Sequence, residues 1–286
     1  MKKPLLILSL LFINLAILQA FSLRVEPNKL QENLSSYTIL DTREESIYKK
    51  GHIKNALNFP VSLTYENKTI NGKLTNPLKM QKIIQDLGLN TKDTLVVYDN
   101  GSFFDASRLF WALEVYGFSN VKLLNAGYKQ WSAKDFSTST ETQKIKKSDY
   151  IAIVNNKRLA TKFTTQIATK NPNQVIVDAR GLNAYLGKES AAKRFGHIPK
   201  ALSIPATHNI NYNKELTELK GDKALKELYK EININQKVII YCAIGKIAST
   251  NYFAMRELGY DVSNYDASWR EWGNDFALPI VQESKE

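Results

Sequence analysis

The chain contains an internal repeat, which limits its fold more than any other feature of the sequence. Residues 39–60 and 176–205 share, in the same order, Asp-x-Arg, a tyrosine, Gly-His-Ile-x-x-Ala and a proline. The second copy has eight extra residues between the tyrosine and the Gly-His-Ile group. A second shared block covers 95–118 and 238–260. The common order indicates tandem duplication of a domain of roughly 120 residues, which is an ordinary domain size.

Each copy alternates strand-like and helix-like segments. Short apolar runs rich in β-forming residues occupy 37–40, 95–98, 175–177 and 238–241, and helical stretches such as 77–87 and 224–231 lie between them. Short apolar runs of this kind suit strands that are buried on both faces, and their alternation with helices predicts a parallel sheet flanked by helices in each copy. The content of 43% hydrophobic and 23% charged residues excludes wholesale disorder and a multi-span membrane protein.

The repeat and the polar stretch between its copies divide the chain into domains. A first domain is predicted over 23–136 and a second over 158–282, and they are joined by a polar, charged linker over 137–157. Because one chain already holds a pseudo-symmetric pair of domains, we expect the protein to be a monomer.

The first 20 residues have the pattern of a secretory signal peptide. Lys2 and Lys3 precede a short apolar core over 5–18, and Ala20 is a small residue before a cleavage point. The core is short for a membrane-spanning helix, which needs about 20 apolar residues, although an extension to Leu23 is compatible with an uncleaved anchor. We therefore expect export to a bacterial periplasm, with membrane contact only through such an anchor. Removal of the two lysines lowers the formal net charge from +11 to +9, which suits anionic partners.

Cys242 is the only cysteine of the chain. One cysteine excludes an intramolecular disulfide and a multi-thiolate zinc or iron–sulfur site. Exported proteins usually pair their cysteines, so this lone residue is either a buried, inert apolar side chain or a working thiol. The count alone leaves both interpretations open.

Four motif blocks, repeated in order, resemble the two-domain rhodanese-like sulfurtransferases. The stretch from Asp-x-Arg to the proline resembles the N-terminal signature of that family, and Tyr-Asp-Ala-Ser-Trp-Arg-Glu-Trp at 265–272 resembles the stretch after its active-site helix. Cys242 and the following Ala-Ile-Gly-Lys-Ile-Ala stand where the family keeps its catalytic loop. The resemblance covers about 23–279. It implies two α/β domains, each with a five-stranded, mainly parallel sheet flanked by helices, of which only the C-terminal one is catalytic.

The local pattern around Cys242 supports a nucleophilic thiolate. The run at 238–241 is a strand candidate and 248–258 a helix candidate, so Cys242 opens the loop between them. Amides at the start of a helix favour negative charge, and the thiolate is the nucleophilic form of cysteine. Gly245 permits a tight backbone that aims these amides inward, and Lys246 adds a positive charge beside the sulfur.

The expected reaction is a ping-pong sulfur transfer without a metal or an organic cofactor. The Cys242 thiolate takes the outer sulfur of a small anionic donor and holds it as a persulfide, and a thiol, cyanide or a protein thiol then accepts it. Lys246 favours thiosulfate as the donor. The loop lacks the Gly-Ser-Gly run typical of mercaptopyruvate-using relatives, which makes 3-mercaptopyruvate the second choice.

The insertion in the second copy is the expected place for further donor contacts. It contains Lys188, Lys193 and Arg194, and the resemblance implies that arginines of this segment bind the anionic donor. Ala184 stands where active relatives tend to have an arginine, so Arg194 is the first candidate and the two lysines follow. Each of the three is equally compatible with a solvated surface charge.

The first copy carries Asp99 at the position of Cys242. A carboxylate cannot carry a sulfane sulfur, so this copy is predicted to be a structural partner that walls a cleft at the domain interface. His52 and His197 occupy equivalent places although only one copy has the cysteine, which indicates a structural role for both. The acidic and basic residues of the two motifs are expected to form scaffold contacts, Asp41 with Arg43 and Asp178 with Arg180.

The sequence disfavours two other functions and leaves a third one open. A cysteine phosphatase needs an arginine six residues after the cysteine, and Ala248 stands there. Nucleic-acid binding is disfavoured because the lysines are dispersed and export is predicted. A persulfide carrier without turnover, or a thiol-based partner-binding protein of the cell envelope, stays open as the alternative to an enzyme.

Overall fold

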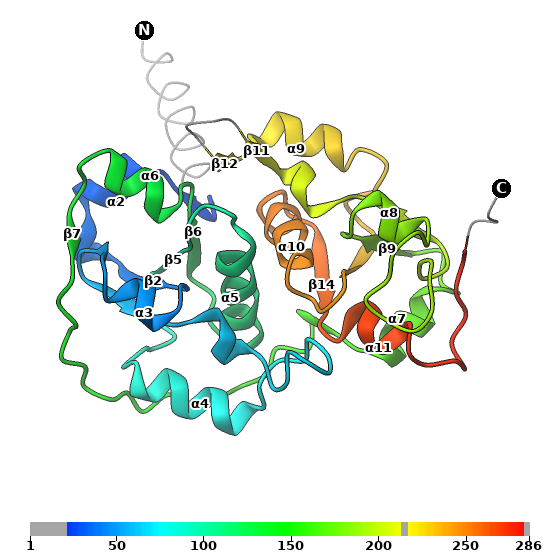
Figure 1. The fold of residues 1–286 in the computed structure, drawn as a ribbon, viewed down its shortest axis with the longest axis horizontal. Helices are drawn as coiled ribbons and strands as arrows, with labels where there is room; N and C mark the ends of the chain where they lie inside the picture. The colour runs from blue at the N-terminus through cyan, green and yellow to red at the C-terminus, as the bar shows by residue number, and fades with distance from the viewer. Residues whose placement is uncertain (1–21, 213–216, 283–286) are drawn as a thin grey trace, which may run out of the picture.

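The computed structural model describes residues 22–212 and 217–282. The predicted signal peptide at 1–20 lies outside these residues. Two α/β units lie side by side, the N-terminal domain in blue to green and the C-terminal domain in light green to red (Figure 1). Among the described residues, we find no helix with the length and apolar character needed to cross a membrane.

The N-terminal domain is built on a five-stranded parallel sheet with the order β1-β6-β5-β2-β4. Its strands are β1 (Arg24–Val25), β2 (Thr38–Asp41), β4 (Ala56–Asn58), β5 (Leu95–Tyr98) and β6 (Val121–Leu124). Its helices are α2 (Pro27–Glu32), α3 (Glu45–Tyr48), α4 (Pro77–Asp86), α5 (Phe104–Val115) and α6 (Tyr128–Ala133), with 3-10 turns at Leu34–Ser36 and Val61–Thr64. β3 (His52–Ile53) and β7 (Thr138–Ser139) form a separate antiparallel pair.

The C-terminal domain repeats this architecture with the parallel order β10-β9-β13-β14-β8. Its strands are β8 (Leu159–Ala160), β9 (Gln174–Asp178), β10 (Ala201–Ser203), β13 (Lys237–Tyr241) and β14 (Asp261–Tyr265). Its helices are α7 (Lys162–Ala168), α8 (Leu182–Tyr185), α9 (Asp222–Leu228), α10 (Ala248–Glu257) and α11 (Ser268–Trp272), with a 3-10 turn at Ala206–Asn209 and an antiparallel pair β11 (Ile210–Tyr212) and β12 (Thr217–Leu219). The predicted pair of five-stranded parallel sheets is confirmed.

The central strand of each sheet leads to the position singled out in the sequence. β5 and β13 are the central strands, and Asp99 and Cys242 follow them directly. The apolar residues of both strands are buried, as expected for strands covered on both faces. The carboxyl end of a central parallel strand is the usual place for a site in an α/β domain.

The repeated Asp-x-Arg motif builds the same buried unit in each domain. In the C-terminal domain, Asp178 accepts hydrogen bonds from Arg180 and, at 2.5 Å, from the hydroxyl of Tyr241. Arg180 also donates to the carbonyl of Gly196 at 2.8 Å. The N-terminal domain forms the equivalent contacts among Asp41, Arg43, Tyr98 and Gly51. The motif therefore connects the central strand, its neighbour and the Gly-His-Ile turn.

The two histidines have the same surroundings. His52 stacks on Tyr48 and His197 on Tyr185, in each case with ring centres 3.8 Å apart and planes at 9°. The Nδ1 atoms lie 3.0 Å and 2.9 Å from the carbonyl oxygens of the same two tyrosines. Identical contacts in a domain with the cysteine and in one without it agree with the predicted structural role.

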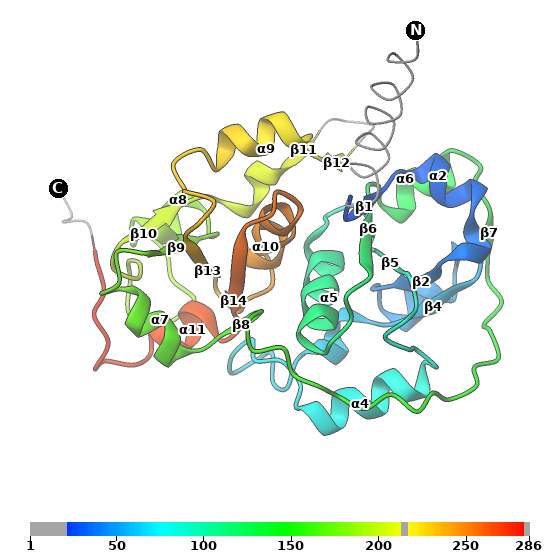
Figure 2. The same ribbon diagram turned by 180° about the vertical axis from the view of Figure 1, so that it is seen from behind.

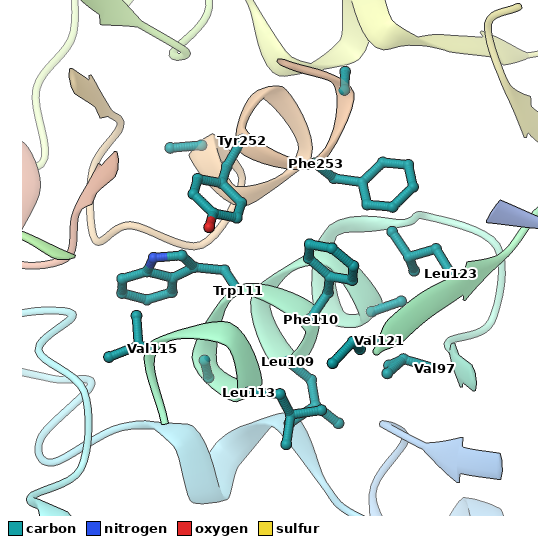
Figure 3. Close-up of a cluster of buried hydrophobic side chains, with 14 of the residues drawn as sticks. Val97, Leu109, Phe110, Trp111, Leu113, Val115, Val121, Leu123, Tyr252 and Phe253 are labelled. Carbon is teal, nitrogen blue, oxygen red and sulfur yellow. The ribbon is translucent and has the colours of Figure 1, made fainter. Parts of the chain in front are cut away.

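The two domains meet through α5 and α10, which face each other at the centre of the molecule (Figures 1 and 2). Phe110 packs edge-on against Phe253 with ring centres 5.0 Å apart, and Trp111 and Tyr252 lie beside them (Figure 3). The hydroxyl of Tyr252 donates to the carboxylate of Glu114 across the interface. These side chains belong to a hydrophobic core that is continuous from one domain to the other.

The predicted linker at 137–157 lies along the N-terminal domain, passing α4 before it reaches β8 (Figure 2). Ser148 donates its amide to the carbonyl of Gln85 in α4 at 3.1 Å, and the side-chain amide of Gln85 donates to the carbonyl of Tyr150 at 2.8 Å. This connection is therefore fixed to α4 rather than extended into solvent.

Candidate active site

Cys242 lies between the central strand β13 and helix α10, at the start of a six-residue loop over 242–247. The residue is 1% exposed. Its amide donates to Oγ of Ser268 at 3.1 Å, and its carbonyl accepts from the amide of Trp269 at 3.0 Å. Both partners belong to α11, so this helix fixes the backbone on either side of the Cys242 side chain.

The loop presents a series of free backbone amides. Within the described residues, no amide from 244 to 248 donates a hydrogen bond to another residue. Free amides at the start of a helix stabilise an anion. The loop therefore has the donors needed to hold a thiolate or a persulfide on Cys242.

The N-terminal domain shows what such a loop can bind. Asp99, the equivalent of Cys242, turns its carboxylate onto its own loop, where it accepts from the amide of Gly101 at 2.7 Å and the hydroxyl of Ser102 at 3.1 Å. The amide of Ala106 lies 3.4 Å from the same carboxylate. Burial raises the pKa of Asp99, and the Gly101 amide opposes this shift. In this domain a built-in acidic group accepts from the Gly101 amide, whose equivalent at Ile244 makes no hydrogen bond within the described residues.

Gly245 is required by the shape of the catalytic loop. Its φ angle of +68° lies in the left-handed region, which side chains other than glycine rarely adopt. A Cβ atom there would lie 2.7 Å from the carbonyl oxygen of Asp266 and 3.0 Å from the guanidinium of Arg108. Gly245 therefore lies too close to Asp266 of its own domain and to Arg108 of the N-terminal domain to carry a side chain.

We expect Gly245→Ala to destabilise the protein by about 2 kcal/mol, because it combines a left-handed alanine with a backbone clash. It should also lower the rate of sulfur loading onto Cys242, since the loop must shift. Gly221→Ala is a control without strain or a clash: Gly221 has a φ of −68° and open space around it, so that variant should lose only the N-cap preference for glycine and should load like the wild type. Thermal unfolding and mass spectrometry after incubation with thiosulfate measure both effects.

The N-terminal domain forms one wall of the site. The backbone of Gly72 is so close to the loop that an added Cβ would lie 1.7 Å from the carbonyl oxygen of Ile244. Two residues on, the amide of Leu74 donates to Oδ2 of Asp266 at 2.9 Å. Burial raises the pKa of Asp266, while the Leu74 amide opposes the shift. The predicted role of the N-terminal domain as a wall of the site thus has direct contacts to support it.

Arg108 of α5 reaches from the N-terminal domain to the catalytic loop. Its guanidinium donates to the carbonyl of Gly245 at 3.2 Å and to that of Gly72 at 2.7 Å. It also stacks on the rings of Tyr65 and Trp111, at 4.4 Å and 4.6 Å from their centres. Arg108 is completely buried. Its two hydrogen bonds connect the backbone at Gly72 with the loop that carries the cysteine.

The charged form of Arg108 is stabilised by acidic groups around it. Burial lowers the pKa of Arg108, and negative charge on Tyr65, on Asp266 and on Cys242 opposes that shift. A thiolate on Cys242 and the guanidinium therefore stabilise each other. No sequence motif singles out Arg108, because it belongs to the copy that is predicted to be non-catalytic. The available signal was an arginine within a helix whose other residues are mostly apolar.

Lys246 points toward the N-terminal domain. Its Nζ lies 2.5 Å from Oδ1 of Asp105, at the start of α5, and both side chains are partly exposed. The predicted loop cation is thus present beside Cys242 but is paired with a carboxylate. Its contact with a donor stays a prediction.

The insertion residues lie on the C-terminal domain. The guanidinium of Arg194 donates to four backbone carbonyls, those of Trp272, Gly273, Asp275 and Leu278. Lys188 and Lys193 are exposed. These bonds use four of the five N–H donors of the guanidinium, which leaves one at Nη1 for an anionic substrate. The assignment of Arg194, Lys193 and Lys188 as donor contacts stays a prediction.

Comparisons with known proteins agree with this geometry. The family model described as rhodanese-like domain matches the chain twice, over 26–134 and 160–275. The chain is 29% identical over 245 residues to "Putative thiosulfate sulfurtransferase SseA" of Mycobacterium leprae, covering 82% of this chain and 81% of that protein. It is 28% identical over 242 residues to 3-mercaptopyruvate sulfurtransferase of Escherichia coli, covering 82% and 84%.

Solved structures show the same fold. The crystal structure of SseA from Escherichia coli matches with a TM-score of 0.77 at 24% identity and covers 87% of this chain and 99% of that one. The crystal structure of YnjE matches with a TM-score of 0.81 at 18% identity, covering 92% and 71%. Together with the two family matches, these similarities confirm the predicted resemblance: the chain belongs to the rhodanese-like domain family and carries two such domains in tandem.

Proposed function

We propose that this protein is a sulfurtransferase that moves a sulfane sulfur from a small anionic donor to a thiophilic acceptor through a persulfide on Cys242. The observation that carries the proposal is the loop at 242–247, whose amides are free around the only cysteine, while the equivalent loop of the other domain holds the carboxylate of Asp99. The names of the relatives, thiosulfate and 3-mercaptopyruvate sulfurtransferases, support the same class of reaction.

The reaction has two half-reactions. The Cys242 thiolate attacks the outer sulfur of thiosulfate, the sulfur–sulfur bond breaks, and sulfite leaves with the bonding electrons. Cys242 then carries a persulfide anion, which the loop amides stabilise. In the second step a thiolate or cyanide attacks the terminal sulfur, and the Cys242 thiolate leaves and is regenerated. The direct test is thiocyanate formation from thiosulfate and cyanide, repeated with 3-mercaptopyruvate to rank the donors.

Lys246 supports thiosulfate as the favoured donor. If it attracts the donor, Lys246→Met should raise KM for thiosulfate about threefold, the size expected for a partly exposed charge. Asp105→Asn frees the lysine from its carboxylate partner and should lower KM instead. Opposite changes in KM identify a donor contact. Equal changes in both variants would mean that the ion pair only holds the interface.

A persulfide carrier is the second candidate function. Its support is the burial of Cys242, which at 1% exposure restricts the acceptors that can reach it. A carrier would load from a donor but pass its sulfur to a protein thiol much faster than to cyanide. Comparing single-turnover unloading by cyanide, a small thiol and a reduced protein thiol distinguishes the two functions.

We also propose export to the periplasm and a monomeric state. The support for export is the basic start and short apolar core at 1–20. The full chain with a C-terminal tag, expressed in a Gram-negative host, should appear in the periplasmic fraction and begin near residue 21. Recovery only from the membrane fraction with an intact N-terminus would instead indicate an uncleaved anchor. Light scattering of the purified protein measures its oligomeric state.

A further inference from the structure

Tyr65 carries a buried hydroxyl that the fold does not use. It follows the 3-10 turn Val61–Thr64 and pairs with Leu74 in an antiparallel bridge. The residue is 4% exposed, and within the described residues its Oη makes no hydrogen bond. A buried hydroxyl without a partner lowers stability, so such groups are rare and usually have a function.

The segment that carries Tyr65 covers the catalytic loop. We call residues 65–74 the covering segment, which begins and ends at the Tyr65–Leu74 bridge. Gly72 lies against the carbonyl of Ile244, and Leu74 is hydrogen-bonded to Asp266. The covering segment therefore brings the N-terminal domain into contact with the loop that Cys242 opens.

Arg108 fixes the orientation of the Tyr65 ring. Its guanidinium lies 4.4 Å from the ring centre, and it donates to the carbonyl of Gly245 in the catalytic loop. A stacked arginine restricts the ring to one plane. The aromatic side chain is thus held beside the loop by a contact that does not involve its hydroxyl.

The Tyr65 hydroxyl is protonated at neutral pH. Burial raises the pKa of Tyr65 to about 12, the charge of Arg108 opposes this shift, and negative charge on Cys242 and Asp105 adds to it. Arg108 contacts both the Tyr65 ring and the Gly245 carbonyl, so the tyrosine lies at the interface that contains the catalytic loop. Tyr65 is therefore a hydrogen-bond donor under all conditions in which the thiolate reacts.

The described structure has no hydrogen bond between the Tyr65 hydroxyl and the Cys242 sulfur. We propose that Tyr65 of the cysteine-free domain donates this bond once the sulfur becomes an anion, first to the thiolate and then to the persulfide. The inference rests on the proposed function and adds to it a second domain that takes part in the chemistry. No proton is transferred: the hydroxyl keeps its hydrogen and stabilises the negative charge on sulfur. This contact supplies the hydrogen-bond partner that the Tyr65 hydroxyl otherwise lacks. It also gives the N-terminal domain, which has no cysteine, a part in the chemistry.

The test is Tyr65→Phe, which removes only the hydroxyl and leaves the ring on Arg108. Tyr260→Phe is the matched control, because the buried Tyr260 hydroxyl donates to the carbonyl of Ile232 at 3.1 Å, inside the C-terminal domain. Three quantities are measured for each variant: the melting temperature, the rate of Cys242 alkylation by iodoacetamide as a function of pH, and the rate of sulfur loading from thiosulfate.

For Tyr65→Phe we expect an unchanged or higher melting temperature, because an unpartnered hydroxyl is removed. The midpoint of the alkylation–pH profile should move to higher pH by at least about half a unit, and loading should slow about tenfold, as expected for the loss of a hydrogen bond to a charged group. Tyr260→Phe should melt lower but keep the alkylation profile and the loading rate.

The inference is overturned if Tyr65→Phe alkylates and loads like the wild type. It is also overturned if Tyr65→Phe melts lower with an unchanged alkylation profile, since its role is then structural. Failure of the proposed function looks different: the wild type would take up no sulfur, whereas the alkylation comparison would still report the contact between Tyr65 and Cys242.

Discussion

Cys242→Ser is expected to take up no sulfur from thiosulfate or from 3-mercaptopyruvate. A serine hydroxyl is protonated at neutral pH and a far weaker nucleophile than a thiolate, so loading should fall by at least about four orders of magnitude. The fold should survive, because residue 242 is held by its backbone amide and carbonyl, which bind Ser268 and Trp269. Intact-mass measurement reads the loading, and a thermal melt verifies the fold.

The matched control acts at the equivalent position of the other domain. Asp99→Asn weakens the contacts of the carboxylate with Gly101 and Ser102 and should destabilise the protein by about 1 kcal/mol. It should leave loading on Cys242 unchanged. Loading that survives in Cys242→Ser, or disappears in a folded Asp99→Asn, would contradict the assignment of one catalytic and one structural loop.

Arg108→Met is the second substitution with a large expected effect. Methionine fills much of the same volume but cannot donate to the carbonyls of Gly72 and Gly245. Of these, Gly245 keeps hydrogen bonds from Asn264 and Ser249, whereas the Gly72 carbonyl has no second donor among the described residues. Losing charge-assisted hydrogen bonds inside the protein should cost about 3 kcal/mol of stability.

The same substitution should slow sulfur loading at least about tenfold, because a buried positive charge that is hydrogen-bonded to the catalytic loop is lost and Tyr65 loses its stacking partner. Arg256→Met is the control. Arg256 also crosses the interface, where it pairs with Glu114 at 2.9 Å, but among the described residues it makes no hydrogen bond or ion pair with the catalytic loop. It should lose stability and keep its loading rate. Equal loss of loading in both variants would show that Arg108 matters only for holding the domains together.

The fold could be predicted from the sequence because its main elements are repeated. Two copies of the same strand–loop–helix pattern, each with buried apolar strands, restrict the chain to two parallel sheets, and the structure confirms both. The position of Cys242 followed from the same pattern, since a residue after a central parallel strand lies at the edge where α/β domains bind ligands.

The contributions of the N-terminal domain could not be predicted in the same way. Arg108 lies on a mostly apolar helix of the copy without the cysteine. Tyr65 lies in a segment without periodicity. Their relation to Cys242 arises only when α5 packs on α10 and residues 65–74 lie across the catalytic loop. Such contacts join residues that are more than 130 positions apart, as between Arg108 and Gly245, so no local pattern encodes them.

The sequence does not distinguish two possible roles of the basic residues in the insertion. Three basic residues close together resemble a site for an anion, and Arg194 is the first candidate among them. In the structure its guanidinium donates to backbone carbonyls of the segment after α11. An arginine that caps carbonyls and an arginine that binds a substrate look alike in a sequence, because both need only a charged, multidentate donor.

The most direct test of the central claim is the intact mass of the purified protein before and after incubation with thiosulfate. The account predicts a gain equal to one sulfur atom, removed by cyanide with release of thiocyanate and absent from Cys242→Ser. The same measurement with 3-mercaptopyruvate ranks the donors. An unchanged mass of the folded wild type with both donors, or a gain that persists in Cys242→Ser, would contradict the claim that Cys242 carries the sulfur.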